Sequence, residues 1–183
     1  MEFFDCVFNR RTARRFLQDP VSKEDLHKMV DAARYAPTGY NNQSIRYIVI
    51  SSPEKVAEAF QFTGWLTGRP SEDEKPAAYI AVLQDTSISK NRCDPPCAVY
   101  AIQLAAHALG YGSCWHGRRD NPEFKEFLGV AEHIEPQVLV SIGKSAETAV
   151  VHDPSDDWRV RKQEDGTIHL GKYALDDVIL SEM

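Results

Sequence analysis

The segment from Asp94 to Leu109 constrains the fold more than any other part of this sequence. Apolar residues, many of them alanine, recur on nearly every face of the helix that the segment predicts. Such a helix is stable in water only when other elements cover most of its surface, so we expect it to be the central buried helix. Pro95 near the start and Gly110 after the last apolar residue are typical of a helix start and a helix end.

Apolar spacing and turn residues on either side of this segment predict the elements that cover it. The predicted helices cover residues 3–8, 22–36, 53–60, 94–109 and 122–128, with a short helical piece at 175–180. The predicted strands cover 45–50, 77–83 and 138–142, residues 63–75 read as a loop, and Asp165–Gly166 predicts a hairpin between 158–162 and 167–170. With no repeat and no linker, this order indicates one α+β domain over residues 1–183.

The charge balance argues against some classes of function. The 183 residues include 21 Lys and Arg against 27 Asp and Glu, a formal net charge of −6. Binding to nucleic acid or to an anionic membrane depends on attraction between basic side chains and phosphate, so neither is expected. No apolar stretch reaches the roughly 18 residues that span a bilayer, and the N-terminus lacks the pattern of an export signal, so we expect a cytoplasmic protein.

The four cysteines, Cys6, Cys93, Cys97 and Cys114, are too scattered for a disulfide scaffold, and free thiols are expected. Cys93 and Cys97 are close enough in sequence to suggest half of a zinc site. A structural zinc ion needs four ligands, however, and the sequence has no second pair. We therefore predict no metal site.

Three polar segments stand out from the apolar pattern, and the first is basic. Residues 10–15, Arg-Arg-Thr-Ala-Arg-Arg, place four arginines together in an acidic chain. Like charges repel, and a phosphate would offset them, since guanidinium groups offer paired donors and Thr12 adds a hydroxyl. The alternative is a solvated turn whose arginines pair with surface carboxylates.

The second and third segments are rich in turn residues. Residues 36–43, Ala-Pro-Thr-Gly-Tyr-Asn-Asn-Gln, offer groups that donate and accept, which suits a flat heterocycle, although the same residues are common in connecting turns. Residues 110–117, Gly-Tyr-Gly-Ser-Cys-Trp-His-Gly, contain glycines that permit close approach of the backbone to a ligand. The alternative there is a tight turn, with Trp115 in the core and His116 in solvent.

In this order the three segments resemble the motifs of the flavin-dependent nitroreductase family. Residues 10–16 resemble the family's Arg-Arg-Ser-x-Arg-x-Phe, residues 36–43 its Ala-Pro-Ser-Gly-x-Asn-x-Gln, and residues 110–117 its Gly-Leu-Gly-x-Cys-Trp-Ile-Gly. The resemblance implies a three-layer α+β fold with a central mixed or antiparallel sheet flanked by helices. It also implies an intertwined homodimer with FMN at the subunit interface.

The resemblance also implies which residues hold FMN. Those at the phosphate and ribityl chain are Arg10, Arg11, Thr12 and Arg14, with Lys172 as the C-terminal basic residue and Arg161 and Lys162 as its rivals. Those that reach the flavin ring from the other subunit are Pro37, Thr38, Gly39, Asn41 and Gln43. Those at the redox edge of the ring are Cys114, Trp115, His116 and Gly117.

Flavin chemistry adds two expectations. Reduction places negative charge near N1 and the C2 carbonyl, so Arg10 or Arg14 is expected there, and a backbone N–H of His116 or Gly117 is expected at N5. The imidazole of His116, where the family has Ile, could donate a proton, bind an anionic substrate or point to water. No residue is assigned as the general acid.

The implied function is a two-step redox enzyme. NAD(P)H reduces bound FMN and leaves, and an electron-poor acceptor such as a nitroaromatic or a quinone then takes the electrons, with ping-pong kinetics. Two alternatives share the fold: a non-catalytic module that binds or senses FMN, and a flavin-fragmenting or dehalogenating relative. A third alternative, based on periodicity alone, is a structural protein without a cofactor.

Overall fold

This computed structural model describes residues 2–65, 68–117 and 121–183. The chain forms two compact units, residues 1–145 and 146–183, and one long strand organises the first of them. Strand β5 (Ile134–Ser145) pairs with β3 (Ala78–Asp85), which pairs in turn with β2 (Ile45–Ile50). The other edge of β5 pairs with β4 (Gly112–Gly117) and, further along, with β1 (Phe16–Leu17). All these pairings are antiparallel, and the predicted α+β class with a central sheet is confirmed.

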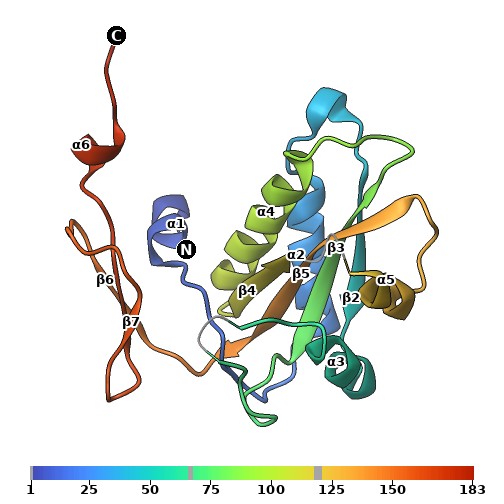
Figure 1. Cartoon of the computed structure of the whole chain (residues 1–183), viewed down its shortest axis with the longest axis horizontal. Coiled ribbons are helices and arrows are strands. Elements are labelled where there is room, and N and C mark those ends of the chain that lie inside the picture. Colours follow the sequence, from blue (N-terminus) through green and yellow to red (C-terminus); the bar gives the residue numbers. More distant parts are fainter. Residues whose placement is uncertain (1, 66–67, 118–120) are drawn as a thin grey trace. The chain divides into compact units, whose positions relative to one another are not determined.

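Helices cover both faces of the sheet (Figure 1). Helices α2 (Lys23–Arg34) and α4 (Asp94–Ala108) pack on the face that carries Ala78, Ile80 and Val82 of β3. Helices α3 (Pro53–Phe60) and α5 (Pro122–Leu128) pack on the face that carries Tyr79, Ala81 and Leu83. Because successive side chains of a strand point to opposite faces, β3 is buried on both sides and reads as a continuous apolar run.

Side-chain caps fix where three of these helices begin. Ser22, Ser52 and Asn121 each accept the backbone N–H three residues further along, at 3.0, 3.4 and 2.8 Å. Gly129, in the left-handed region with φ of 63°, ends α5. These starts and this end are as predicted from the sequence. No helix in the described part of the chain combines the length and apolar character needed to cross a bilayer.

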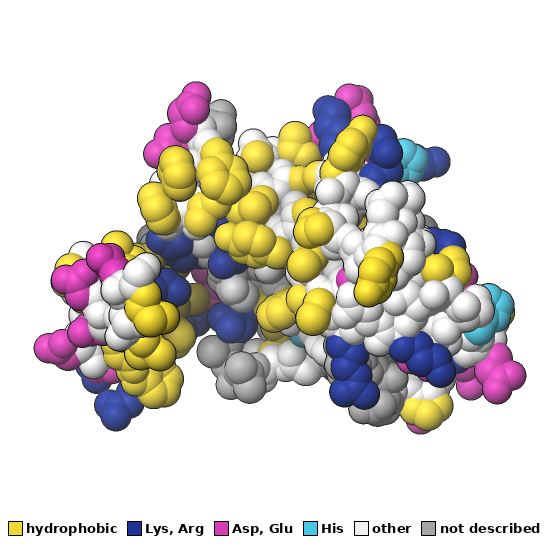
Figure 2. Space-filling model, turned by 90° about the horizontal axis from the view of Figure 1, so that it is seen from above, with side chains coloured by type: hydrophobic (Ala, Val, Ile, Leu, Met, Phe, Trp, Pro, Cys, Tyr) yellow, Lys and Arg dark blue, Asp and Glu magenta, His cyan; other side chains and the backbone are white. Residues whose placement is uncertain are grey.

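Two helices are less covered than their sequences predict. Helix α1 (Phe3–Asn9) forms, but Phe3, Phe4 and Phe8 remain 65, 67 and 65% exposed. Helix α4 packs firmly on the sheet and on α2, yet Tyr100 on its outer side is 44% exposed. The expectation that α4 is covered on nearly all sides is therefore only partly met, and hydrophobic side chains are prominent on the surface in Figure 2.

Strand lengths differ from prediction where pairing rather than apolar pattern sets them. The short segment after α4 becomes the six-residue strand β4, and β5 extends on both sides of the predicted 138–142. Strand β1 has only two residues and no alternation of its own, so its sequence carries no strand signal.

The second unit is a small sheet followed by one helical turn. Strand β8 (Ile168–Gly171) lies between β6 (Ala149–His152), which is parallel to it, and β7 (Arg161–Lys162), which is antiparallel. The hairpin predicted at Asp165–Gly166 joins β7 to β8, with Gly166 at φ of 85°. The predicted helical piece forms α6 (Leu175–Val178). The unpredicted β6 exists only through its pairing with β8.

Candidate functional site

The arginine segment lies against the start of the third polar segment. The backbone N–H of Ala13 donates to the carbonyl of Ser113 at 3.1 Å, and Thr12 and Ser113 form a parallel bridge. Gly112 permits this approach, because a Cβ on it would lie 2.6 Å from the Cβ of Ala13. The structure therefore brings together two of the three segments that the sequence singles out.

Arg10 carries buried polar atoms that suit an anion. Its Nε and Nη1 are buried and make no hydrogen bond with any described residue. Burial and the charge of Arg10 lower the pKa of Arg11, and burial with the charges of both arginines lowers the pKa of His107. Buried cationic donors without acceptors are unfavourable, so the ligand that best satisfies this cluster is an anion such as phosphate.

The remaining arginines of the segment have different surroundings. Arg11 donates to the carbonyl of Arg10 at 2.6 Å, and Arg14 is half-buried. Arg15 instead forms an ion pair with Glu74 at 3.0 Å. The alternative of a solvated turn paired with carboxylates therefore describes Arg15 but not the buried nitrogens of Arg10.

Strand β4 leaves part of one face open. Trp115 and Gly117 share that face, since they are two residues apart on a strand. Trp115 is 51% exposed, which overturns the alternative that placed it in the core. A Cβ on Gly117 would meet no atom of residues 2–65, 68–117 or 121–183 within 4 Å. On the opposite face, Cys114 is buried. Gly117 is thus the position in β4 where a flat ligand could approach the backbone.

His116 lies on the buried face of β4 and is only 5% exposed, so the expectation that it points to water is wrong. Its Nδ1 lies 3.1 Å from the carbonyl oxygen of Gly64, and its Nε2 lies 2.8 Å from Oγ of Ser141. A carbonyl only accepts, so Nδ1 carries the hydrogen. The ring also packs edge-on against Trp65, with centroids 4.5 Å apart. Both nitrogens therefore serve the fold.

The second polar segment is held by the start of α4. The backbone N–H of Gly39 donates to Oδ1 of Asp94 at 3.0 Å, and Nδ2 of Asn91 donates to the same oxygen at 2.8 Å. Tyr40, Asn41 and Gln43 have φ of 54, 54 and 52°, a region that L residues occupy only with support from their surroundings. The segment is a built turn rather than an arbitrary connection.

Within one chain the second segment lies far from the other two (Figure 1). The second segment is attached at Asp94, the first residue of α4. The thiol of Cys6, in α1, donates to the carbonyl of Leu104, and the backbone N–H of Tyr111 donates to the carbonyl of Ala106. The other two segments are therefore attached near the end of α4. Ten or more helical residues at ~1.5 Å each put the two groups on the order of 15–18 Å apart along the axis. One copy alone does not join all three segments.

The C-terminal basic residues belong to the second unit. Lys172 follows β8 and is exposed; its backbone N–H donates to the carbonyl of His152. Arg161 forms an ion pair with Asp157, and Lys162 lies in β7. The choice of Lys172 for a phosphate contact stays a prediction.

Sequence reasoning missed three residues that hold the site segments in place: Asp94, which binds Gly39, and Ser141 and Trp65, which contact His116. In the sequence, Asp94 predicts only a helix start, and Ser141 and Trp65 fall in a predicted strand and a predicted loop. Asp94 is 3% exposed, which is unusual for a carboxylate. Its place at the start of an apolar helix was the one available signal, and Gly39, 55 positions earlier, is too distant in sequence to be inferred as its partner.

The sequence matches the Nitroreductase family over residues 7–88 and 96–144. All three polar segments lie within this match. The chain belongs to the nitroreductase family. This result confirms the resemblance on which the expectations about the site depend.

Individual relatives agree with this assignment. A protein of Archaeoglobus fulgidus, provisionally named NADH dehydrogenase/NAD(P)H nitroreductase, is 30% identical over 167 residues, which cover 85% of this chain and 92% of the relative. The FMN-dependent nitroreductase of Clostridium difficile R20291 is 28% identical, with a TM-score of 0.67 over 79% of this chain and 88% of that one. A Bacteroides fragilis nitroreductase solved with bound FMN, 24% identical, shares the fold with a TM-score of 0.66 over 85% of this chain and 94% of that one.

Proposed function

We propose that this nitroreductase-family enzyme binds FMN and transfers electrons from NADH or NADPH to an electron-poor acceptor such as a nitroaromatic or a quinone. The observation that carries the proposal is the pair of buried Arg10 nitrogens that have no acceptor among the described residues, next to Thr12 and the start of β4. The FMN-dependent relative from Clostridium difficile supports the choice of this anion-bearing cofactor.

The residues present fit FMN in chemistry and in space. Arg10, Arg11, Thr12 and Arg14 would hold its phosphate and ribityl chain, with Lys172 as a further cation. The open face over Gly117 would admit the ring, with Trp115 two residues earlier on the same face of β4 and the buried Cys114 behind it. Bound FMN supplies the two-electron chemistry between nicotinamide and acceptor. The chain supplies cationic groups that favour negative charge on the ring, and backbone N–H groups that orient it.

His116 has a positioning role in this proposal rather than a catalytic one. Its Nδ1–H is directed to Gly64 and its Nε2 to Ser141, so its imidazole joins the loop after α3 to β4 and β5. The backbone of His116 and Gly117 would still lie along the ring. A proton needed by the acceptor would then come from solvent rather than from this side chain.

The proposal requires a homodimer, because one chain separates the second polar segment from the other two. A second copy with its α4 reversed would bring Pro37, Thr38, Gly39, Asn41 and Gln43 to the first copy's arginine segment. The exposed phenylalanines of α1 and Tyr100 of α4 offer apolar surface for such a contact. In the second unit, Trp158, Tyr173, Leu175 and Leu180 are 58, 50, 70 and 98% exposed, which suits an arm that packs on another copy. We propose that both units, residues 1–183, form one functional FMN-binding domain.

Three measurements test the function. Protein saturated with FMN and desalted should keep the flavin absorbance and elute as a dimer; a colourless monomer would reject the proposal.

The second measurement tests electron transfer: mixing the FMN-loaded protein with NADH or NADPH in a stopped-flow instrument should bleach the oxidised flavin. Flavin that stays oxidised with both nucleotides would favour a sensing module. Initial rates with both substrates varied should give parallel lines, and intersecting lines would reject the ping-pong order.

A further inference from the structure

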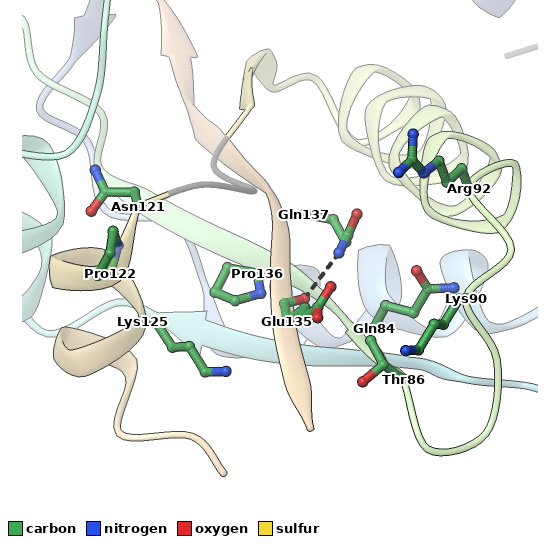
Figure 3. A pocket seen from close by; sticks show the side chains of 10 residues that line it. All are labelled: Gln84, Thr86, Lys90, Arg92, Asn121, Pro122, Lys125, Glu135, Pro136 and Gln137. Carbon is green, nitrogen blue, oxygen red and sulfur yellow. Dashed lines mark hydrogen bonds between the residues drawn. The ribbon is translucent and has the colours of Figure 1, made fainter. Parts of the chain in front are cut away.

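A polar cavity of about 420 Å³ lies at the beginning of β5, beyond the end of β4 (Figure 3). In sequence order its lining residues are Gln84, Thr86, Lys90, Arg92, Asn121, Pro122, Lys125, Glu135, Pro136 and Gln137. They come from the end of β3, the loop before α4, helix α5 and β5. Nothing in the proposed FMN contacts uses them.

Three uncharged side chains of the cavity already donate hydrogen bonds within the protein. Nε2 of Gln84 donates to the carbonyl of Asn91 at 2.9 Å, and Nε2 of Gln137 donates to that of Glu135 at 3.4 Å, the dashed line in Figure 3. Oγ1 of Thr86 donates to the carbonyl of His133 at 2.9 Å. These bonds hold the cavity in shape, so ligand recognition must come from the charged side chains around them.

Those charged side chains are mostly cationic. Lys90, Arg92 and Lys125 line the cavity together with one carboxylate, Glu135. Nζ of Lys125 donates one hydrogen bond, to the carbonyl of Glu132 at 2.6 Å, and has two further hydrogens to donate. Within the described residues, neither Lys90 nor Arg92 has a carboxylate in ion-pair range. Figure 3 shows Lys125 on one side of β5 and Lys90 and Arg92 on the other.

This local excess of positive charge contrasts with the net charge of −6 of the whole chain. Elsewhere the surface cations tend to pair with neighbouring carboxylates, as Lys55 does with Glu58 and Lys75 with Glu72. Lys90 and Arg92, which have no such partner among the described residues, attract anions to the cavity, and a guanidinium binds phosphate or carboxylate through paired donors.

The cavity is next to the expected redox edge. Gly117, the last residue of β4, pairs with Val138 of β5, and Gln137 is the neighbouring residue. A substrate whose reactive part lies over Gly117 could therefore extend a charged substituent toward Lys90 and Arg92.

We propose that this cavity binds the anionic group, phosphate or carboxylate, of one redox substrate of the enzyme. This inference rests on the proposed function. Two substrates can carry such an anionic group. The donor NADPH carries the 2′-phosphate that distinguishes it from NADH, and an electron acceptor can carry a carboxylate.

The test uses FMN-loaded protein and the double variant Lys90→Gln/Arg92→Gln. The control Lys23→Gln/Lys55→Gln removes two exposed cations from α2 and α3 and leaves the cavity intact. Titration with inorganic pyrophosphate, followed by calorimetry, should show binding to the wild type and the control, and binding at least ten-fold weaker in the cavity variant. Equal binding in all three proteins, or no binding to the wild type, overturns the proposal.

Steady-state kinetics then separate the two sources. If the donor is recognised, the ratio of kcat/KM for NADPH over NADH falls at least ten-fold in the cavity variant; if the acceptor is recognised, the ratio for 4-nitrobenzoate over nitrobenzene falls instead. Loss of pyrophosphate binding with both ratios unchanged overturns the link to a substrate. A protein that binds pyrophosphate through Lys90 and Arg92 but is not reduced by either nucleotide refutes the proposed function and leaves the anion site standing.

Discussion

Gly39 and Asp94 are 55 positions apart in the sequence and are joined by one hydrogen bond, from the backbone N–H of Gly39 to Oδ1 of Asp94. Asn91 donates to the same oxygen and packs so closely that a Cβ on Gly39 would lie 2.6 Å from its Nδ2. This contact fixes the polar turn of one copy to the first residue of α4. The position of the turn therefore depends on a carboxylate outside the sequence motif, and in the proposed dimer this carboxylate would also set how the turn meets the other copy.

Replacement of Asp94 by alanine should loosen this turn. It leaves the N–H of Gly39 and the amide of Asn91 without their acceptor, which should cost about 1–3 kcal/mol of unfolding free energy. Under the proposed function, FMN affinity should fall as well. Asp94→Asn keeps an oxygen at the same place and should recover most of both losses. Urea unfolding and flavin titration measure the two effects, and equal behaviour of the two variants would contradict this role.

Replacement of Arg10 by methionine should separate ligand binding from folding. The methionine removes two buried donors that have no acceptor among the described residues, so the free protein should lose no thermal stability. FMN binding should weaken by about 10- to 150-fold, since a charge-assisted hydrogen bond contributes about 1.5–3 kcal/mol. Arg15→Met, which removes the ion pair with Glu74, is the matched control and should leave FMN affinity unchanged. A parallel loss in both variants would refute the assignment of Arg10.

Two glycines of β4 should respond in opposite ways to alanine. Gly112→Ala forces a Cβ to within 2.6 Å of the Cβ of Ala13 and 3.2 Å of that of Ser145, and should cost about 1–3 kcal/mol. The new Cβ of Gly117→Ala meets no atom within 4 Å in the part of the chain that the structure describes, so the change in stability should be less than about 0.5 kcal/mol. The substitution should nevertheless weaken FMN binding by occupying the space proposed for the ring. Thermal unfolding and flavin titration of both variants make the comparison, and normal FMN affinity in Gly117→Ala would argue against a ring at this position.

Replacement of His116 by phenylalanine tests whether its imidazole acts on a proton. The variant leaves the carbonyl of Gly64 and the hydroxyl of Ser141 without their ring contacts, and should lose about 1–3 kcal/mol of stability. The tryptophan fluorescence should change because Trp65 packs on this ring, and Trp65→Phe identifies that contribution. The pH profile of acceptor reduction should keep its shape. Loss of one limb of the profile would instead make His116 a proton donor.

The hydrogen bond from Tyr111 to Asp25 should give stability a defined dependence on pH. The Tyr111 hydroxyl donates to Oδ2 of Asp25 at 2.9 Å and, together with Ser22, holds the pKa of Asp25 below its ordinary value of 3.8. Because the folded-state pKa is lowered, the stabilisation is present above pH 3.8 and is lost as the pH falls through the lower folded-state value.

Tyr111→Phe should therefore unfold at a lower urea concentration than the wild type at pH 7. The gap between the two midpoints should narrow as the pH is lowered below the ordinary pKa of an aspartate, where the carboxylate becomes protonated. Tyr100→Phe, on the outer side of α4, serves as the control. A gap that is the same at neutral and acidic pH would show that the ionised form of Asp25 is not what Tyr111 stabilises.

Local signals in the sequence were enough for most of the secondary structure. The caps at Ser22, Ser52 and Asn121 and the left-handed Gly129 depend on neighbours three or four residues away, so the chain near them already contains the physical cause. The three polar segments and their order were equally visible, and they sufficed to identify the family. The apolar run at 77–83 correctly indicated a strand, which the structure shows as β3.

Tertiary structure decided everything that depends on distant partners. Whether His116 faces water or the interior is set by Gly64 and Ser141, and whether Trp115 is buried is set by what packs over β4. The short strands β1 and β6 exist only because strands distant in sequence, β5 and β8, offer them backbone partners. Contacts of this kind are chosen by the packing of the whole chain, because hydrogen bonds and apolar contacts form between groups close in space, whereas a sequence pattern records only what is close along the chain.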